Sequence, residues 1–328
     1  MRLSEPSRIG RTRQEAVIYS FSHRTDGPAF YWPWFLDRLD EGFAQVRNPY
    51  YPDKVSTYDL HGPECEGFTF TSKDYRPVLD GRGRRSALDR LLDRHATMWS
   101  FTINPYRSDV ERHVPTNAEA VACAAELSRF VGRERMTWMY SPIAMWDGVY
   151  DWSYHVTAFT WLAEHLAEHV SRVSIDELRV YEKVSRNAPF LREPHHWELE
   201  VMLPRFAEVC DRVGIELHSC HAHHDWSRYG VDMSPCMSLE RFGEVNGLVP
   251  KGLKVPSGSG LYGTCPGGCA SVRDLAPYDS CPAGCLYCYA NSDVGGRKPH
   301  FDVSSTMLCD GVRALDSVSH AKQKRYFA

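Results

Sequence analysis

Three cysteines, Cys281, Cys285 and Cys288, have the spacing of ligands to an iron–sulfur cluster. A loop this short can wrap its sulfurs round one corner of a cubane, because Gly284 allows a tight turn and Pro282 stiffens its start. A [4Fe–4S] cluster takes four ligands, usually cysteine thiolates, so a loop that supplies three leaves one iron free to bind something other than protein. A structural zinc site would take a fourth protein ligand and usually has two paired C-x2-C knuckles.

The spacing C-x3-C-x2-C, with Tyr287 just before the last cysteine, resembles the signature of radical S-adenosylmethionine (radical SAM) enzymes. The resemblance implies that the free iron chelates the amino and carboxylate groups of SAM, and that the reduced cluster cleaves SAM to a 5′-deoxyadenosyl radical. It also implies that Tyr287 flanks the adenine. Most members carry the motif near the N-terminus, whereas here it follows residue 280. A zinc knuckle or an incidental cysteine-rich tail is the alternative interpretation.

Four further cysteines, from three segments, could form a second metal site: Cys220, Cys236, Cys265 and Cys269. Four thiolates could hold an auxiliary [4Fe–4S] cluster or a tetrahedral zinc ion. Their spacing does not distinguish iron from zinc, and the resemblance of the neighbouring motif favours iron.

Histidines at 218, 221, 223 and 224 surround Cys220. Imidazoles beside a cysteine could bind zinc or iron, or could lie in a polar loop facing solvent. We expect one of them, His221, to donate or accept a proton in the active site. A zinc hydrolase or deaminase built from these histidines with Cys265 and Cys269 is an alternative, but the sequence lacks an HExxH or HxE pairing there.

Composition limits the expected binding partners and the cellular compartment of the protein. The chain has 328 residues and a net charge of −4, with a pI of about 6.4, so no global attraction to nucleic acid is expected. The first residues lack the apolar region of a signal peptide, and no apolar run is long enough to span a membrane. Eleven cysteines without an export signal favour metal ligation in a reducing compartment, so we predict a cytoplasmic protein.

Short β-type runs alternate with helical patterns through the first two thirds of the chain. Strands are expected at 16–21, 67–71, 97–103, 136–140, 170–175 and 215–219, and helices at 30–43, 87–92, 116–131, 154–168 and 197–213. Such alternation indicates βα units and a parallel sheet. We therefore predict an α/β fold, a partial (β/α) barrel of about six units in residues 1–225. A cysteine-rich iron–sulfur region, 226–328, packs on it. The periodic pattern weakens after 225, residues 255–263 are loop-like, and a short helix is expected near 310–321.

In such a barrel, the carboxyl ends of the strands carry the chemistry. Arg24 and Asp26 follow the first expected strand, and Lys73 follows the second. By position we expect these three side chains and Asn48 to bind SAM or substrate. Residues at strand ends are also often no more than solvated loop starts.

The resemblance extends over residues 17–291. It is carried by segments at 22–31, 46–50, 70–73, 101–106, 180–183 and 229–231. These look like a bacterial family of unassigned function that has its radical-SAM-type cysteines at the C-terminal end. The resemblance implies a barrel related to the radical SAM fold, with the cluster loop at the other end of the chain.

The chain departs from that family at several positions. His23 stands where the family has an arginine, and Met139 to Pro142 replaces an Arg-Tyr-Asp-Pro segment. This loss of a charged pair implies a specialised substrate pocket. Gly267 stands at the first cysteine of a C-x-C pair, which changes the expected ligand set of the second cluster.

Together these features predict a radical SAM enzyme that acts on a small molecule. It would take electrons from a reducing partner such as flavodoxin or ferredoxin. The second cluster would transfer electrons or donate sulfur, which points to sulfur insertion or sulfur-for-oxygen exchange on a nucleoside-type natural-product intermediate. The alternatives are the zinc hydrolase or deaminase and a non-catalytic iron–sulfur redox protein.

Overall fold

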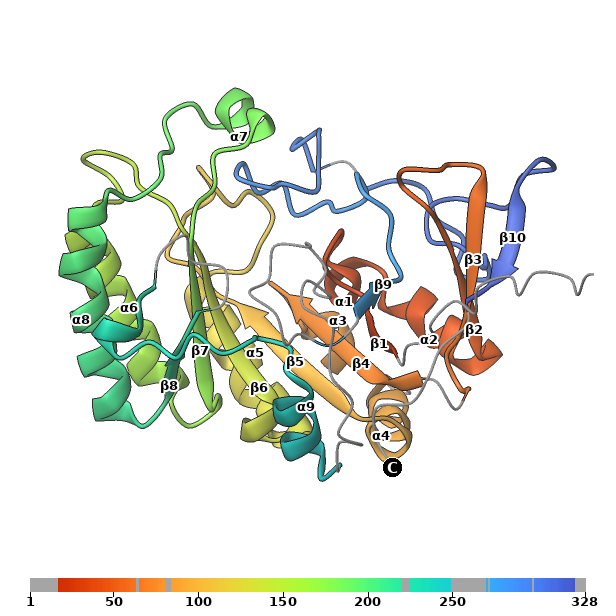
Figure 1. The fold of residues 1–328 in the computed structure, drawn as a ribbon, viewed down its shortest axis with the longest axis horizontal. Coiled ribbons are helices and arrows are strands. Elements are labelled where there is room, and N and C mark those ends of the chain that lie inside the picture. The colour runs from red at the N-terminus through yellow and green to blue at the C-terminus, as the bar shows by residue number, and fades with distance from the viewer. Residues whose placement is uncertain are drawn as a thin grey trace, which may run out of the picture.

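The structure is a computed structural model that describes residues 17–62, 65–80, 84–219, 225–248, 270, 272–296 and 298–321. A large parallel sheet lies at the centre, and a small three-stranded sheet stands at one end of the molecule (Figure 1). Residues 63–64, 81–83, 220–224, 249–269, 271, 297 and both ends of the chain lie outside the described part.

The large sheet has seven strands, all parallel. Across the sheet they run β8 (Glu216–His218), β7 (Arg172–Glu177), β6 (Met136–Ile143), β5 (Thr97–Thr102), β4 (Cys65–Ser72), β1 (Val17–Ser20) and β9 (Val272–Asp274). The α/β class and the six expected strands are confirmed. Closure into a barrel stays a prediction, as does the boundary between the two expected regions near residue 225.

Helices follow most of the strands. They are α1 (Gly27–Phe30), α2 (Trp32–Glu41), α3 (Arg76–Leu79), α4 (Arg84–Arg94), α5 (Asn117–Val131), α6 (Trp152–Leu166), α7 (Glu182–Asn187), α8 (His196–Val213) and α9 (Leu239–Asn246), with 3₁₀ turns at Arg133–Arg135 and Ser227–Tyr229. α5 begins where its sequence predicts, because Thr116 and Glu119 form a capping box. α6 packs on α8, where the rings of Phe159 and Phe206 stack 3.9 Å apart.

The core lies between the sheet and these helices. All four residues of β1 are buried, as expected for a strand covered on both faces of a parallel sheet. Beside it an aromatic cluster joins α2 to β4 and β5, with Phe70 and Trp99 ring centroids 4.4 Å apart. Trp32 and Phe35 of α2 complete this cluster. This packing fixes the strand ends that carry the site.

The small sheet contains β2 (Phe43–Arg47), β3 (Lys54–Asp59) and β10 (Ser317–His320). The helix expected near 310–321 is wrong, because β10 is an extended strand that pairs in parallel with β3. Backbone pairing to β3 outweighed a weak local helical pattern that has no cap. The loop expected at 255–263 lies outside the described residues. After residue 225, where the sequence pattern weakens, α9 and β9 both form.

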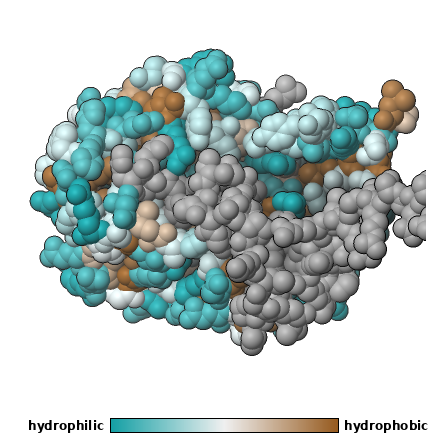
Figure 2. Space-filling view, viewed as in Figure 1, coloured by the Kyte–Doolittle hydropathy of each residue, from teal (hydrophilic) through white to brown (hydrophobic). Residues whose placement is uncertain are grey.

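No helix among the described residues is long and apolar enough to cross a membrane. Where the face in Figure 2 is coloured it is mostly hydrophilic, with hydrophobic residues in small groups. Groups of this kind are normal on a surface that water covers.

Candidate functional site

The cysteine loop leaves the carboxyl end of β9, which pairs with β1 at the edge of the large sheet. Ile18 pairs with Val272, and Leu275 N–H continues the ladder by donating to Ser20 O at 2.8 Å. The loop that carries Cys281 therefore begins at the edge of the sheet where β1 and β4 end (Figure 1). The motif is displaced in sequence, but β9 places it beside the first strand.

The path of the loop depends on Gly284, whose φ is +69°. A Cβ built there would lie 3.1 Å from His113 Cδ2 and 3.1 Å from Val294 O. Glycine is needed both for the left-handed backbone and for this close approach. The sequence-based role of Gly284 in a tight turn is confirmed.

The loop is docked by backbone hydrogen bonds onto the segment that follows β5. His113 N–H donates to Ala283 O at 3.0 Å, and Leu286 N–H donates to Val110 O at 3.0 Å. Between them Glu111 and Cys285 form an isolated antiparallel bridge. These bonds hold the cysteines over the carboxyl ends of the strands.

Burial raises the pKa of each of the three thiols, that of Cys281 to about 12. Backbone N–H groups favour the thiolates: those of Ala283 and Asp26 donate to Cys281, and two others donate to Cys288. At Cys285 the ammonium of Lys73 opposes the rise in pKa that burial causes. Within the described residues, no three His, Cys, Asp or Glu side chains gather as ligands of a single metal ion.

A buried charged network lies under the loop. Lys73 Nζ donates to Glu111 Oε1 at 2.8 Å, and their side chains are 14% and 4% exposed. The same oxygen accepts from Asn104 Nδ2 at 3.0 Å and from the hydroxyl of Tyr287. Burial disfavours the charged form of Lys73, but the carboxylate of Glu111 outweighs it, so its pKa is raised.

Asp26 is buried beside this network. Its carboxylate accepts from Ser72 Oγ at 2.6 Å, from Lys73 N–H at 2.8 Å and from Ala29 N–H at 3.1 Å. Burial raises the pKa of Asp26 to about 6, against the lowering effect of these donors. Because its own N–H donates to Cys281, Asp26 links the end of β1 to the cysteine loop.

Arg24 braces the start of the loop. Its N–H donates to Asp274 Oδ2 at 2.7 Å, and its guanidinium donates to Ala276 O at 3.4 Å and lies 4.9 Å from the ring centre of Tyr278. Burial raises the pKa of Asp274 to about 7. The observed contacts of Arg24 are structural, and its expected role as a ligand stays a prediction.

Asn48 lies elsewhere, in the turn between β2 and β3. Its side-chain oxygen accepts from Tyr50 N–H at 2.9 Å and from Tyr51 N–H at 3.1 Å. Both bonds stay within that turn, so the structure does not bring this side chain to the cysteines by any hydrogen bond. Its expected role in binding SAM stays a prediction.

Most of the second expected metal site, namely Cys220, Cys265 and Cys269, lies outside the described residues, and so does His221. Cys236 is described, and its thiol is half-buried and not disulfide-bonded. The second cluster and the proton-transfer role of His221 therefore stay predictions.

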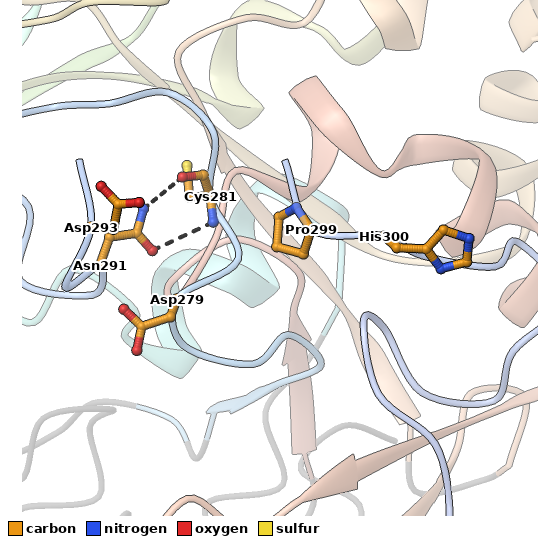
Figure 3. Close-up of a pocket in the computed structure, with 6 residues that line it drawn as sticks. All are labelled: Asp279, Cys281, Asn291, Asp293, Pro299 and His300. Carbon is orange, nitrogen blue, oxygen red and sulfur yellow. Dashed lines mark hydrogen bonds between the residues drawn. The ribbon is translucent and has the colours of Figure 1, made fainter. Parts of the chain in front are cut away.

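An open pocket of about 360 Å³ adjoins Cys281. It is lined by Asp279, Cys281, Asn291, Asp293, Pro299 and His300 (Figure 3). Asn291 fixes the cysteine by two bonds, donating from Nδ2 to its carbonyl at 2.6 Å and accepting from its N–H at 3.4 Å.

Sequence reasoning missed Glu111 and Asp274 as site residues and read Asn104 only as one of the polar residues at the strand ends. Asn104 follows β5 and Asp274 ends β9, so both obey the strand-end rule that identified Lys73. Glu111 does not follow the end of a strand directly. It lies in the long loop after β5, which turns back to the cysteines, so the strand-end rule could not identify it. The pocket wall at His300 also had none.

The family model for a domain of unknown function, DUF1848, matches residues 18–290. Comparison with curated proteins gave no match. The match spans the large sheet and the cysteine loop and ends before residue 298.

Proposed function

The chain belongs to the DUF1848 family, whose function is unknown, and we propose that it is a radical SAM enzyme acting on a small molecule. The observation that carries the proposal is the position of the three-cysteine loop at the carboxyl edge of the parallel sheet. Such edges carry the ligand and catalytic sites of α/β proteins.

The residues present fit a [4Fe–4S] cluster held by Cys281, Cys285 and Cys288. A cubane distributes its ligands over different irons, so its thiolates need not meet at one point. Backbone donors to Cys281 and Cys288, and the ammonium of Lys73 near Cys285, oppose part of the rise in pKa that burial gives these three thiols.

When bound, a reduced cluster of this kind supplies the electron that cleaves SAM to a 5′-deoxyadenosyl radical. The chain's own part is to hold the reactants and to exclude water. Lys73 offers a buried positive charge, Glu111 a buried negative charge, and Tyr287 an aromatic ring at the same place.

Asp26 has a different part in the proposal. It receives three hydrogen bonds and donates its N–H to Cys281, so it holds the end of β1 at a fixed position against the loop. We assign it a positioning role, together with Arg24 through Asp274.

The finer parts of the proposal rest on the sequence. An auxiliary cluster on Cys220, Cys236, Cys265 and Cys269, sulfur transfer to a nucleoside-type intermediate, and a flavodoxin or ferredoxin as reductant are predictions. A set of four protein thiolates would leave no open iron and would favour electron transfer. A set of three would favour substrate binding or sulfur donation.

The test is iron and acid-labile sulfide per chain on anaerobically reconstituted protein, with EPR of the reduced sample before and after SAM. About eight irons and a signal that changes with SAM support both clusters, and about four support the first alone. The variant with Cys281, Cys285 and Cys288 changed to Ala should lose the SAM-sensitive signal and the release of 5′-deoxyadenosine.

Cys210→Ala is the control, because this buried thiol lies in α8. It should keep the iron content and the response to SAM. Zinc in place of iron, with no effect of SAM, would refute the radical mechanism and leave the zinc hydrolase or deaminase. Iron without a response to SAM would leave the redox protein.

A further inference from the structure

The pocket beside Cys281 has a wall that the DUF1848 match does not include. We infer that residues 298–321, here called the C-terminal segment, complete a substrate pocket that selects a small molecule carrying a positively charged amine. The inference rests on the proposed function, because it takes Cys281 as a ligand of the cluster. It adds the chemical class of the substrate and the segment that recognises it.

The C-terminal segment supplies Pro299 and His300 to the pocket. In the view of Figure 3 they lie on one side of Cys281, and Asn291 and Asp293 lie on the other. The family match ends at residue 290, so this wall comes from a part of the chain beyond the matched region. A pocket closed by such a segment can differ between relatives that share the cysteine loop.

Two carboxylates, those of Asp279 and Asp293, give the pocket its charge. Each uses one oxygen within its own loop: Asp279 Oδ1 accepts from Ser292 N–H at 2.5 Å, and Asp293 Oδ1 accepts from Gly295 N–H at 2.8 Å. Both residues are exposed, and neither takes part in an ion pair within the described residues. Two such carboxylates favour a cationic group.

The described cation nearest in sequence to this wall, Lys298, does not line the pocket. Its ammonium donates to Phe30 O at 2.9 Å. It also lies 5.2 Å and 4.8 Å from the ring centres of Tyr31 and Phe301. These contacts hold the ammonium on the aromatic rings. The charge that the described lining residues present is therefore negative, with the imidazole of His300 beside it.

The C-terminal segment is fixed to the body of the protein. Trp34 Nε1 donates to Ser305 O at 2.8 Å, and Gln45 N–H donates to Thr306 O at 2.8 Å. Arg47 forms ion pairs with Asp310 at 2.6 Å and Asp316 at 2.7 Å. These bonds to α2 and β2 all follow His300 in the chain, and the bond of Lys298 to Phe30 O precedes it. A wall held in this way can present His300 at a constant position.

The size of the pocket limits the ligand. About 360 Å³ equals the volume of roughly a dozen water molecules at about 30 Å³ each. Sites for small molecules begin at about 300 Å³. The pocket thus suits a compact amine of the size of a small metabolite, and one of its walls carries a proposed cluster ligand.

The test uses 1,4-diaminobutane as a cationic probe and 1,4-butanediol as its uncharged match. Binding to the full-length, reconstituted protein is measured by isothermal titration at low ionic strength. We expect the diamine to bind and the diol not to bind. Asp279→Asn and Asp293→Asn should each weaken diamine binding about tenfold, the effect of one lost charge-assisted bond.

Asp225→Asn is the matched control. Asp225 is also exposed, and its Oδ1 also accepts from the N–H two residues on, Ser227, at 2.8 Å. It should bind the diamine as the parent does. Equal binding of diamine and diol, or equal losses for Asp225→Asn and Asp293→Asn, would overturn the inference. His300→Ala should change diamine affinity without changing iron content, and an unchanged affinity would count against the wall.

The same samples separate this inference from the proposed function. A SAM-sensitive EPR signal without diamine binding would refute the amine pocket and leave the radical mechanism. Diamine binding without that signal would keep the pocket and remove the role given to Cys281. Loss of the SAM response in both Asp279→Asn and Asp293→Asn would assign the pocket to SAM itself and overturn the substrate inference.

Discussion

The ion pair between Lys73 and Glu111 allows the sharpest test of the site as the structure presents it. Both side chains are nearly buried, and the nitrogen and oxygen lie 2.8 Å apart. Removing one partner of such a pair leaves a charge in the interior, which costs about 3–5 kcal/mol. Removing both avoids that cost, so the two changes should be strongly non-additive.

We expect Lys73→Met to lower the free energy of unfolding by about 3 kcal/mol, at the lower end of that range. Glu111 keeps its bonds from Asn104 and Tyr287, which stabilise the remaining carboxylate. Glu111→Gln should have a similar effect, because it leaves the ammonium of Lys73 without a carboxylate. The double variant should be more stable than the sum of the two changes predicts by about 2 kcal/mol.

The assay is urea unfolding of the iron-free, reduced chain at pH 7, followed by tryptophan fluorescence, for the parent, both single variants and the double variant. Arg76→Met is the control, because the ion pairs of Arg76 with Asp74 and Glu119 are exposed. It should cost no more than about 1 kcal/mol. Single changes that add to within about 0.5 kcal/mol would refute the buried pair.

The remaining predictions concern the loop, the C-terminal segment and pH. Gly284→Ala should lower cluster loading, measured as iron per chain, because its φ of +69° strains any other residue and its Cβ would lie only 3.1 Å from His113 Cδ2 and Val294 O. Gly132→Ala, at φ +84° in open space, should load normally, and equal loading of both would contradict this. Arg47→Ala should speed limited proteolysis of the C-terminal segment, since Arg47 holds that segment by ion pairs; an unchanged rate would show that other bonds suffice. Arg47 lowers the pKa of Asp316 to about 2. The stability from this pair is therefore present above the unfolded pKa of about 4 and is lost as pH falls towards 2. Asp316→Asn should make the midpoint of urea unfolding less dependent on pH over that range. Burial lowers the pKa of His95 to about 4. The unfolded chain therefore binds more protons at this residue between pH 4 and about 6.5, and stability rises with pH in that range. His95→Gln should reduce this rise, measured as the thermal midpoint, and an identical slope would exclude His95 as its cause.

The sequence was sufficient where one local pattern decided the structure. Alternation of buried strands with helices predicted the parallel sheet, and Thr116 with Glu119 predicted the start of α5. Cysteine spacing and Gly284 predicted a tight loop. These signals depend on neighbours a few residues apart, so they need no knowledge of the rest of the chain.

Long-range contacts were beyond such reasoning. β9 has three residues and forms because β1 offers an edge, and β10 forms because β3 does. Glu111 reaches Lys73 only after the loop following β5 turns back on the sheet. The helix expected at 310–321 failed for the same reason, since pairing with β3 determines that backbone.

The pairing of β9 with β1 makes the site one of the last parts of the fold to form. Ile18 and Val272 pair although 254 positions separate them (272 minus 18). Closing a flexible loop of that length costs about 5 kcal/mol in chain entropy, and contacts so distant in sequence form slowly. β9 has three residues with which to offset that cost, so the intervening sheet must bring the two strands together first. The cysteine loop therefore takes its place only in a fully folded chain. A chain with all its cysteines but a disrupted β1 has no strand edge to which β9 can pair, and so it cannot form the site.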